Sequence, residues 1–169
     1  MLEEPGMKGK LSIVLLVAAV ALLAAAVVRA EEPASPSRAE YVSQVEPICQ
    51  ANTEANEAIL RNVRQKVRNG KLTQAGRQFI HASAAFGSAV DKITAVPRPP
   101  ADEERLLKWF KFLRIVQDDL HKVGTALKKG DKILATHETI RVERSANAAN
   151  NVSYVFEFHY CHLSRSRFT

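Results

Sequence analysis

The stretch LLKWFKFLRIVQDDLHKVGTAL, residues 106–127, decides the fold class. Its large apolar side chains recur at steps of three or four residues, which is the period of one face of an α-helix. The seam that they form consists of Leu106, Trp109, Leu113, Val116, Leu120, Val123 and Leu127. Asp102 precedes the seam as a candidate cap, and Gly130 follows it where glycine commonly ends a helix. The stretch therefore predicts a long amphipathic helix with one buried face.

Another helical pattern begins at Arg38 and continues to Val67, with Gly70 ending it. Pro47 lies inside this pattern and cannot donate a backbone hydrogen bond to the preceding turn. We therefore expect either a kink at Pro47 or a helix that properly starts near Glu46, with a separate turn before it.

Two more helices complete the pattern. One is expected from about Thr73, its candidate cap, to the prolines at 97, 99 and 100. The other follows Asp131 as a cap and extends to about Tyr154, with irregular chain beyond. Its predicted inner stripe consists of Ile133, His137, Ile140, Arg144 and Asn147, with Ala146 and Ala149 beside it. This stripe is the least apolar of the four.

The sequence contains no alternation of strands and turns, no glycine-rich phosphate loop and no long internal repeat. The predicted fold is therefore all-α. Four amphipathic helices with short connections bury their faces most simply as an antiparallel up-down-up-down four-helix bundle. We assign the bundle to residues 38–163, a flexible Pro/Ser/Glu linker to 31–37 and a C-terminal tail to 164–169.

Residues 1–30 have the pattern of an export signal. Lys8 and Lys10 precede an apolar run over 11–28, and Val28-Arg29-Ala30 fits the small-residue rule before a cleavage site. The run is long enough that an uncleaved N-terminal membrane anchor is the alternative. Both interpretations place the bundle outside the cytoplasm. Without this segment, which holds three of the 24 basic and two of the 18 acidic residues, the net charge is +5.

Cys49 and Cys161 are the two cysteines of the chain. Cys49 is near the start of the first predicted helix and Cys161 is just past the end of the fourth. In an up-down-up-down bundle these two ends lie at the same pole, and an exported protein meets an oxidising environment. We therefore predict a Cys49–Cys161 disulfide. His159 and His162 would be candidate metal ligands only if Cys161 were reduced, and their spacing matches no structural zinc pattern.

Cofactor and catalytic patterns give little support for an enzyme. The sequence has no Cys-x-x-Cys-His haem attachment motif, and both methionines precede residue 30. It also lacks the Glu-x-x-His pairs of a di-iron bundle. The adjacent pairs Glu103-Glu104 and Asp118-Asp119 diverge around a helix, so we interpret them as a helix start and a solvated face. We expect a non-enzymatic protein without a cofactor.

Asparagine side chains form the first candidate site. They lie at similar heights on the first and fourth predicted helices: Asn52, Asn56, Asn147, Asn150 and Asn151. Buried amides must find hydrogen-bond partners. The set predicts either a polar layer that fixes helix register or a small polar ligand pocket near the disulfide.

The second candidate site is an interaction patch on the third helix. It comprises Phe112 and Ile115, flanked by Lys108, Lys111 and Arg114. Either the third helix is buried on two sides, or these residues form an exposed apolar patch rimmed by cations. An exposed patch of this kind would suit a partner protein of the envelope or an anionic lipid surface. We expect no nucleic-acid partner.

Three motifs give the chain a family resemblance. They are YVSQVEPICQAN at 41–52, ALKKGD at 126–131, and NAANNV with YCHLSRS near the C-terminus. The chain resembles uncharacterised exported proteins of high-GC Gram-positive bacteria, which have a cysteine in the first helix and a closing C-terminal cysteine. The resemblance implies export and helical architecture, and it transfers no catalytic residue. We therefore expect a secreted or membrane-tethered bundle that serves as a binding or structural module of the cell envelope. A small-ligand or metal binder and a basic binder of anionic polymer or lipid are the alternatives.

Overall fold

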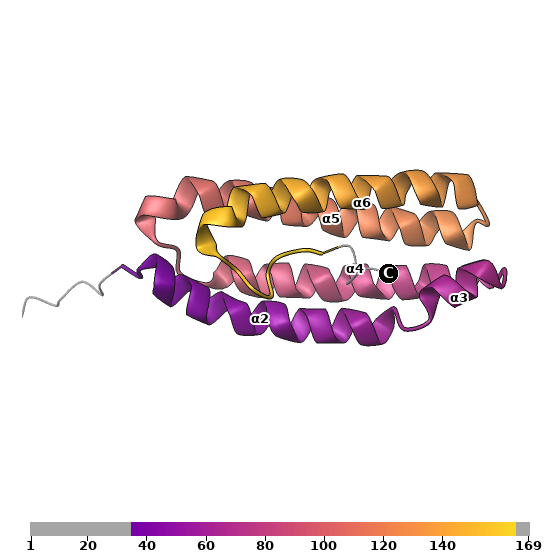
Figure 1. Ribbon diagram of the computed structural model, residues 1–169, viewed down its shortest axis with the longest axis horizontal. Helices are drawn as coiled ribbons and strands as arrows, with labels where there is room; N and C mark the ends of the chain where they lie inside the picture. The colour runs from indigo at the N-terminus through magenta and orange to yellow at the C-terminus, as the bar shows by residue number, and fades with distance from the viewer. Residues whose placement is uncertain (1–34, 165–169) are drawn as a thin grey trace, which may run out of the picture. The chain divides into compact units, whose positions relative to one another are not determined.

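A computed structural model describes residues 35–164. The predicted signal or anchor segment, most of the linker and the last five residues of the tail therefore lie outside the described residues. Within 35–164 the elements are α2 (Arg38–Ile59), α3 (Val63–Arg68), α4 (Leu72–Ala95), η1 (Pro100–Asp102), α5 (Glu103–Lys128), α6 (Lys132–Ser153) and η2 (Tyr154–Phe156). These residues contain no strand, and the four long helices lie side by side in Figure 1. The predicted all-α four-helix bundle is confirmed.

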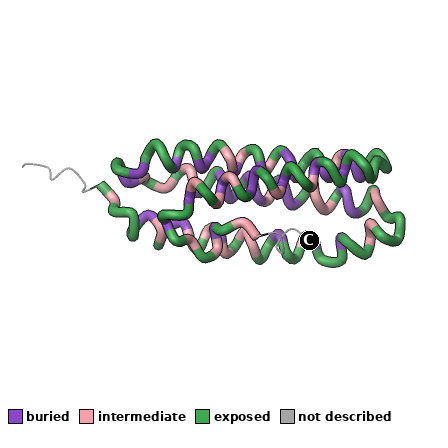
Figure 2. Tube along the Cα trace, turned by 45° about the horizontal axis from the view of Figure 1, so that its top comes forward, coloured by how far each residue is buried: buried purple, intermediate pink, exposed green. Residues whose placement is uncertain are grey.

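The α5 helix is the centre of the core, as its sequence predicts. Every residue of the predicted seam is buried, and Trp109 has no exposed surface. Buried segments recur along the inner sides of the helices in Figure 2. Packing follows the chain, since α2 lies against α4, α4 against α5, and α5 against α6. None of the helices in the described region is both long and apolar enough to cross a membrane.

The first helix excludes one of the two alternatives predicted at Pro47, and it ends earlier than predicted. It runs from Arg38 through Pro47 without a separate first turn. Pro47 and Ser43, whose carbonyl loses its donor, are both exposed, so water can satisfy that carbonyl. The predicted continuation to Gly70 is wrong, because the chain breaks after Ile59 and resumes as the short helix α3. Asn62 at the break has a φ of 62°, in the left-handed region that asparagine tolerates better than most residues.

The predicted inner stripe of the last helix is also wrong. All five of its residues are exposed, and Ile133 retains 76% of its surface. The buried face of α6 consists of Ala135, Glu138, Val142, Ser145, Ala146, Ala149 and Ser153. Small residues on this face let α6 approach α5 closely, and the larger aliphatic residues remain outside.

Of the predicted helix caps, one is confirmed, and one of the acidic residues predicted to be solvated is buried. Asp131 caps α6 as expected, because its carboxylate accepts a hydrogen bond from the Leu134 N–H at 2.8 Å. Thr73 is not a cap, since α4 begins at Leu72. Asp102 occupies the cap position of α5, but its carboxylate binds Arg38 instead of a backbone N–H. Asp119, expected on a solvated face, is 2% exposed.

Candidate functional site

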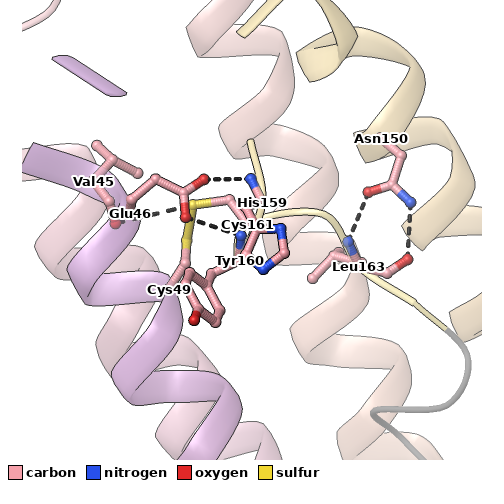
Figure 3. Close-up of a disulfide and its surroundings, with 8 residues drawn as sticks. All are labelled: Val45, Glu46, Cys49, Asn150, His159, Tyr160, Cys161 and Leu163. Atoms are coloured by element: carbon pink, nitrogen blue, oxygen red, sulfur yellow. Dashed lines mark hydrogen bonds between the residues drawn. A yellow bond between two sulfur atoms is a disulfide. The ribbon is translucent and has the colours of Figure 1, made fainter. Parts of the chain in front are cut away.

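The predicted disulfide between Cys49 and Cys161 is present, with 5.0 Å between the Cα atoms. It does not lie at a pole of the bundle, because Cys49 is in the middle of α2. After η2 the chain reverses at Glu157, which has a φ of 52°. Residues 157–164, here called the strap, then run back between α6 and α2 (Figures 1 and 3). Folding back in this way brings Cys161 to Cys49.

Two side chains hold the backbone of the strap, one from each neighbouring helix (Figure 3). The Glu46 carboxylate on α2 accepts hydrogen bonds from the N–H groups of His159 at 2.6 Å and Tyr160 at 2.9 Å. On α6, the Asn150 amide accepts from the Leu163 N–H at 2.9 Å and donates to the Leu163 carbonyl at 2.8 Å. These bonds satisfy backbone groups that no helix or sheet satisfies.

Aromatic rings fill the space beneath the strap. Phe158 stacks on Trp109 with 5.0 Å between ring centroids, and on Phe156 with 5.3 Å. Phe156 in turn contacts Tyr41 at the start of α2. The strap and η2 therefore fill the seam between the first and last helices over one half of the bundle.

A small cavity of about 30 Å³ lies behind the disulfide. Asn52 and Asn56 line it, and the Asn56 Nδ2 donates to the Asn52 Oδ1 at 3.0 Å. Trp109 lines it too, and both the Asn56 Oδ1 and the Trp109 Nε1 are buried without a hydrogen-bond partner among the described residues. The volume suits one water molecule.

The five candidate asparagines do not form one layer. Asn52 and Asn56 bond to each other at the cavity, whereas Asn150 binds the strap. Asn147 and Asn151 are exposed, so the prediction that they belong to a buried layer is wrong. The reason is the rotation of α6, which turns Ala146 and Ala149 inward in their place.

The candidate patch on α5 is divided between two environments. Phe112 packs partly against the core, and Arg114 forms an ion pair with Asp91 on α4. Lys108, Lys111 and Ile115 are exposed. The five residues therefore do not form one continuous exposed patch.

The terminal histidines lie on the strap. The backbone of His159 is held by Glu46, and its ring meets the Tyr160 ring edge-on at 4.6 Å. His162 is exposed, and the sulfur of Cys161 is committed to the disulfide. Within residues 35–164 no three side chains of His, Cys, Asp or Glu are grouped to hold a metal ion.

Asp119 on α5 and Glu138 on α6 are buried carboxylates that both lie near Arg141. Ser145 donates from its hydroxyl to the Asp119 Oδ2 at 3.1 Å, and the Arg141 Nε lies 3.6 Å from Oδ1. Arg141 also lies 3.5 Å from the Glu138 Oε2, and the Lys122 Nζ is 3.6 Å from Asp119. The cations lie outside and the acids inside, as expected for a structural ion-pair network that fixes how two helices meet.

An apolar groove opens at the other end of the bundle, where α3 faces the start of α6. Its volume is about 460 Å³, within the range of about 300–1,000 Å³ typical of small-molecule sites. The residues that line this α3 groove are Val63, Arg64, Val67, Arg68, Phe79, Val123, Leu127, Lys132, Ala135, Thr136 and Thr139. No acidic side chain is among these lining residues.

The break after α2 creates this groove. Gln78 on α4 stabilises the break, because its Nε2 donates to the carbonyls of Ile59 at 2.5 Å and Arg61 at 3.2 Å. Its Oε1 accepts from the Lys66 Nζ at 2.9 Å. The short α3 packs on α4, and the strap does not extend to this end. The seam beside α6 is therefore left open there.

Sequence reasoning missed the groove because it treated α2 and α3 as one helix. The apolar residues Val63 and Val67 continue the spacing of α2, so periodicity gave no warning of a break. Two local signals were available. Asn62 is of a residue type enriched in the left-handed region, and Arg64 and Arg68 place two cations on one face next to the apolar stripe.

No family model, curated protein or solved structure matches this chain in the comparisons. The described residues form two open grooves of about 460 Å³, the α3 groove and one between α2 and α4 beside Ile48 and Ala89, as well as the small cavity behind the disulfide. Of the two grooves, the α3 groove has three cations in its lining, and the cavity has room for one water molecule.

Proposed function

We propose that this chain is a non-enzymatic binding module that works outside the cytoplasm, as part of the cell envelope. Its ligand is a small molecule whose apolar part lies in the α3 groove. The observation that carries this proposal is the groove itself, an opening of about 460 Å³ whose apolar floor is continuous with the core and whose lining includes three cations.

The chemistry of the groove favours binding over catalysis. Its hydroxyl groups are already used locally, since Thr136 donates to the Lys132 carbonyl at 2.9 Å and Thr139 to the Ala135 carbonyl at 2.8 Å. No histidine, cysteine or carboxylate lines it. A nucleophile paired with a base, which acid–base or covalent catalysis requires, is therefore missing from the lining.

The location outside the cytoplasm rests on two observations. The disulfide between Cys49 and Cys161 is consistent with an oxidising compartment. The first 30 residues have the charge and hydropathy pattern of an export signal or anchor. Cleavage would give a secreted protein, and retention would give a tethered one.

A second candidate function is attachment to an anionic polymer or lipid surface through α5. Lys108, Lys111 and Ile115 are exposed, as is Leu107 with 52% of its surface. Cations next to apolar side chains suit an interface of this kind. This candidate predicts binding to anionic vesicles that weakens with salt and is independent of the groove.

Native mass spectrometry tests the proposal on the full chain, expressed with its own N-terminus and purified without detergent. We expect a bound non-covalent mass, and a two-dalton deficit in the protein mass from the disulfide. Thr136→Trp fills the groove from an exposed position of α6, so it should abolish the bound mass. His137→Trp adds the same ring at an exposed position outside the groove lining and should retain it. Equal ligand occupancy in the two variants would contradict a site in the groove.

A further inference from the structure

We infer that the ligand of the α3 groove is a fatty carboxylate, bound with its acyl chain on the groove floor and its carboxylate at a cationic rim. This inference rests on the proposed function, and it adds the chemical class of the ligand. Three features of the groove carry it: the composition of its floor, the charge of its rim and the absence of a competing anion.

The groove floor is built for hydrocarbon. Val63 and Val67 come from α3, Val123 and Leu127 from α5, and Phe79 from α4. Val63, Val123 and Leu127 are among the buried core residues, so the floor is continuous with the core. Each methylene group buried on such a surface stabilises the complex, which favours an aliphatic chain over a polar ligand.

The rim of the groove carries three cations from its two walls. Arg64 and Arg68 are four residues apart on α3, and Lys132 is at the start of α6. All three are exposed, and none forms an ion pair with an acidic side chain of residues 35–164.

A carboxylate fits the hydrogen-bond donors of this rim. A guanidinium group presents paired N–H donors that match the two oxygens of a carboxylate, and the ammonium of Lys132 adds a third charge from the opposite wall. With no acidic residue in the lining, no side chain within the groove competes for these donors. One end of the ligand is therefore anionic and the other apolar.

Two other occupants of the groove, the chain's own C-terminal tail and a second copy of the chain, fit its charge less well. The last five residues of the chain carry Arg165 and Arg167, which have the same charge as the rim. A second copy of the chain would have to offer an acidic apolar surface to the groove. Charge complementarity thus favours a fatty carboxylate over the chain's own tail.

Isothermal titration calorimetry with dodecanoate, below its micelle-forming concentration, tests the inference. We expect one site per chain in the full-length protein. The double variant Arg64→Gln/Arg68→Gln should weaken dodecanoate binding at least tenfold. The matched variant Arg61→Gln/Arg77→Gln removes two exposed arginines that do not line the groove, so its affinity should be unchanged. Dodecanol, which lacks the charge, should bind both variants equally.

Each alternative ligand or occupant of the groove predicts a different experimental outcome. Equal binding of dodecanoate and dodecanol, unaffected by Arg64→Gln/Arg68→Gln but blocked by Thr136→Trp, would overturn the carboxylate inference and leave the proposed function standing. No binding of either amphiphile, with no effect of Thr136→Trp on the co-purified mass, would overturn both. Binding that appears only after residues 165–169 are deleted would identify the tail as the occupant. A stable dimer that Thr136→Trp dissociates would identify a second copy.

Discussion

Arg38 and Asp102, which are 64 residues apart in sequence, form a two-point ion pair at one end of the bundle. The Arg38 Nε donates to the Asp102 Oδ2 at 2.8 Å, and Nη2 donates to Oδ1 at 2.7 Å. The same guanidinium lies 5.4 Å above the centroid of the Phe156 ring. Arg38 thus joins the start of α2 to the start of α5 and to η2, where the strap begins.

The Arg38–Asp102 pair predicts a loss of stability in acid. The hydrogen bonds from Arg38 lower the pKa of Asp102 from its ordinary value, although desolvation acts in the opposite direction. A carboxyl group whose pKa is lowered on folding stabilises the fold above its unfolded pKa of about 3.9, and this contribution is lost as the pH falls through the folded pKa. Asp102→Asn should therefore be less stable than the wild type at pH 7, with the difference disappearing toward pH 2.

Urea denaturation at a series of pH values measures this difference. The control is Glu104→Gln, an exposed position in the first turn of α5 where a substitution should change stability by no more than about 0.5 kcal/mol. A difference between Asp102→Asn and wild type that stays constant from pH 7 to pH 2 would show that the Asp102 charge is not responsible.

The disulfide should contribute substantially to stability, because it joins residues separated by 112 positions. Loops of about this length give about 4.7 kcal/mol in the chain-entropy model, and measured values for native disulfides are about 2–5 kcal/mol. Cys49→Ala/Cys161→Ala should retain the helical far-ultraviolet spectrum, because the α5 seam contains neither cysteine. Its urea midpoint should match that of the reduced wild type. A reducing agent that left the wild-type midpoint unchanged would contradict the bond.

Gly76 and Gly124 mark the closest approach of α4 and α5. A Cβ atom built on Gly76 would lie 2.5 Å from the Gly124 carbonyl oxygen, and one on Gly124 would lie 2.7 Å from the Gly76 carbonyl oxygen. Either alanine substitution should force the helices apart and destabilise the protein by about 1–3 kcal/mol. Ser88→Ala at an exposed position of α4 is the control, and should be neutral or slightly stabilising. Chemical denaturation of the three variants provides the comparison, and a neutral Gly76→Ala would show that the helices adjust.

Sequence periodicity predicted the helices whose buried faces are made of large apolar residues. The prediction of the α5 seam was correct because large apolar side chains such as Trp109 and Leu113 favour burial in the core. The α6 stripe failed for the opposite reason. Its buried face is largely alanine and serine, so Ile133 and Ile140 dominated the pattern although they are exposed. Hydrophobic periodicity detects helix faces made of large apolar residues. It does not detect a buried face made of small residues.

The candidate sites depended on tertiary contacts that no local pattern encodes. The cysteine pairing was predicted from a shared pole, whereas Cys49 lies in the middle of α2 and the strap brings Cys161 to it. The return of the strap depends on Glu46 and Asn150, polar residues that bind backbone groups distant in sequence. The groove similarly depends on Gln78, which satisfies the carbonyls at the break after α2. Each of these residues would pass for an ordinary helix-surface residue in sequence alone.

Gln78 and Asn62 should together stabilise the position of α3 against α4. Gln78→Leu removes the donors to Ile59 and Arg61 and leaves those carbonyls to water, at a cost of about 0.5–1.5 kcal/mol. Asn62→Gly should be neutral or slightly stabilising because glycine adopts the left-handed region freely, whereas Asn62→Val should cost about 1–2 kcal/mol or more.

Native-state hydrogen exchange should show faster exchange in residues 60–70 of Gln78→Leu and unchanged protection in α5. Gln74→Leu, one turn earlier at an exposed position, should leave both regions unchanged. Uniformly faster exchange across the bundle in Gln78→Leu would instead mean that α3 and the core unfold as one unit, and the groove wall could then not move independently.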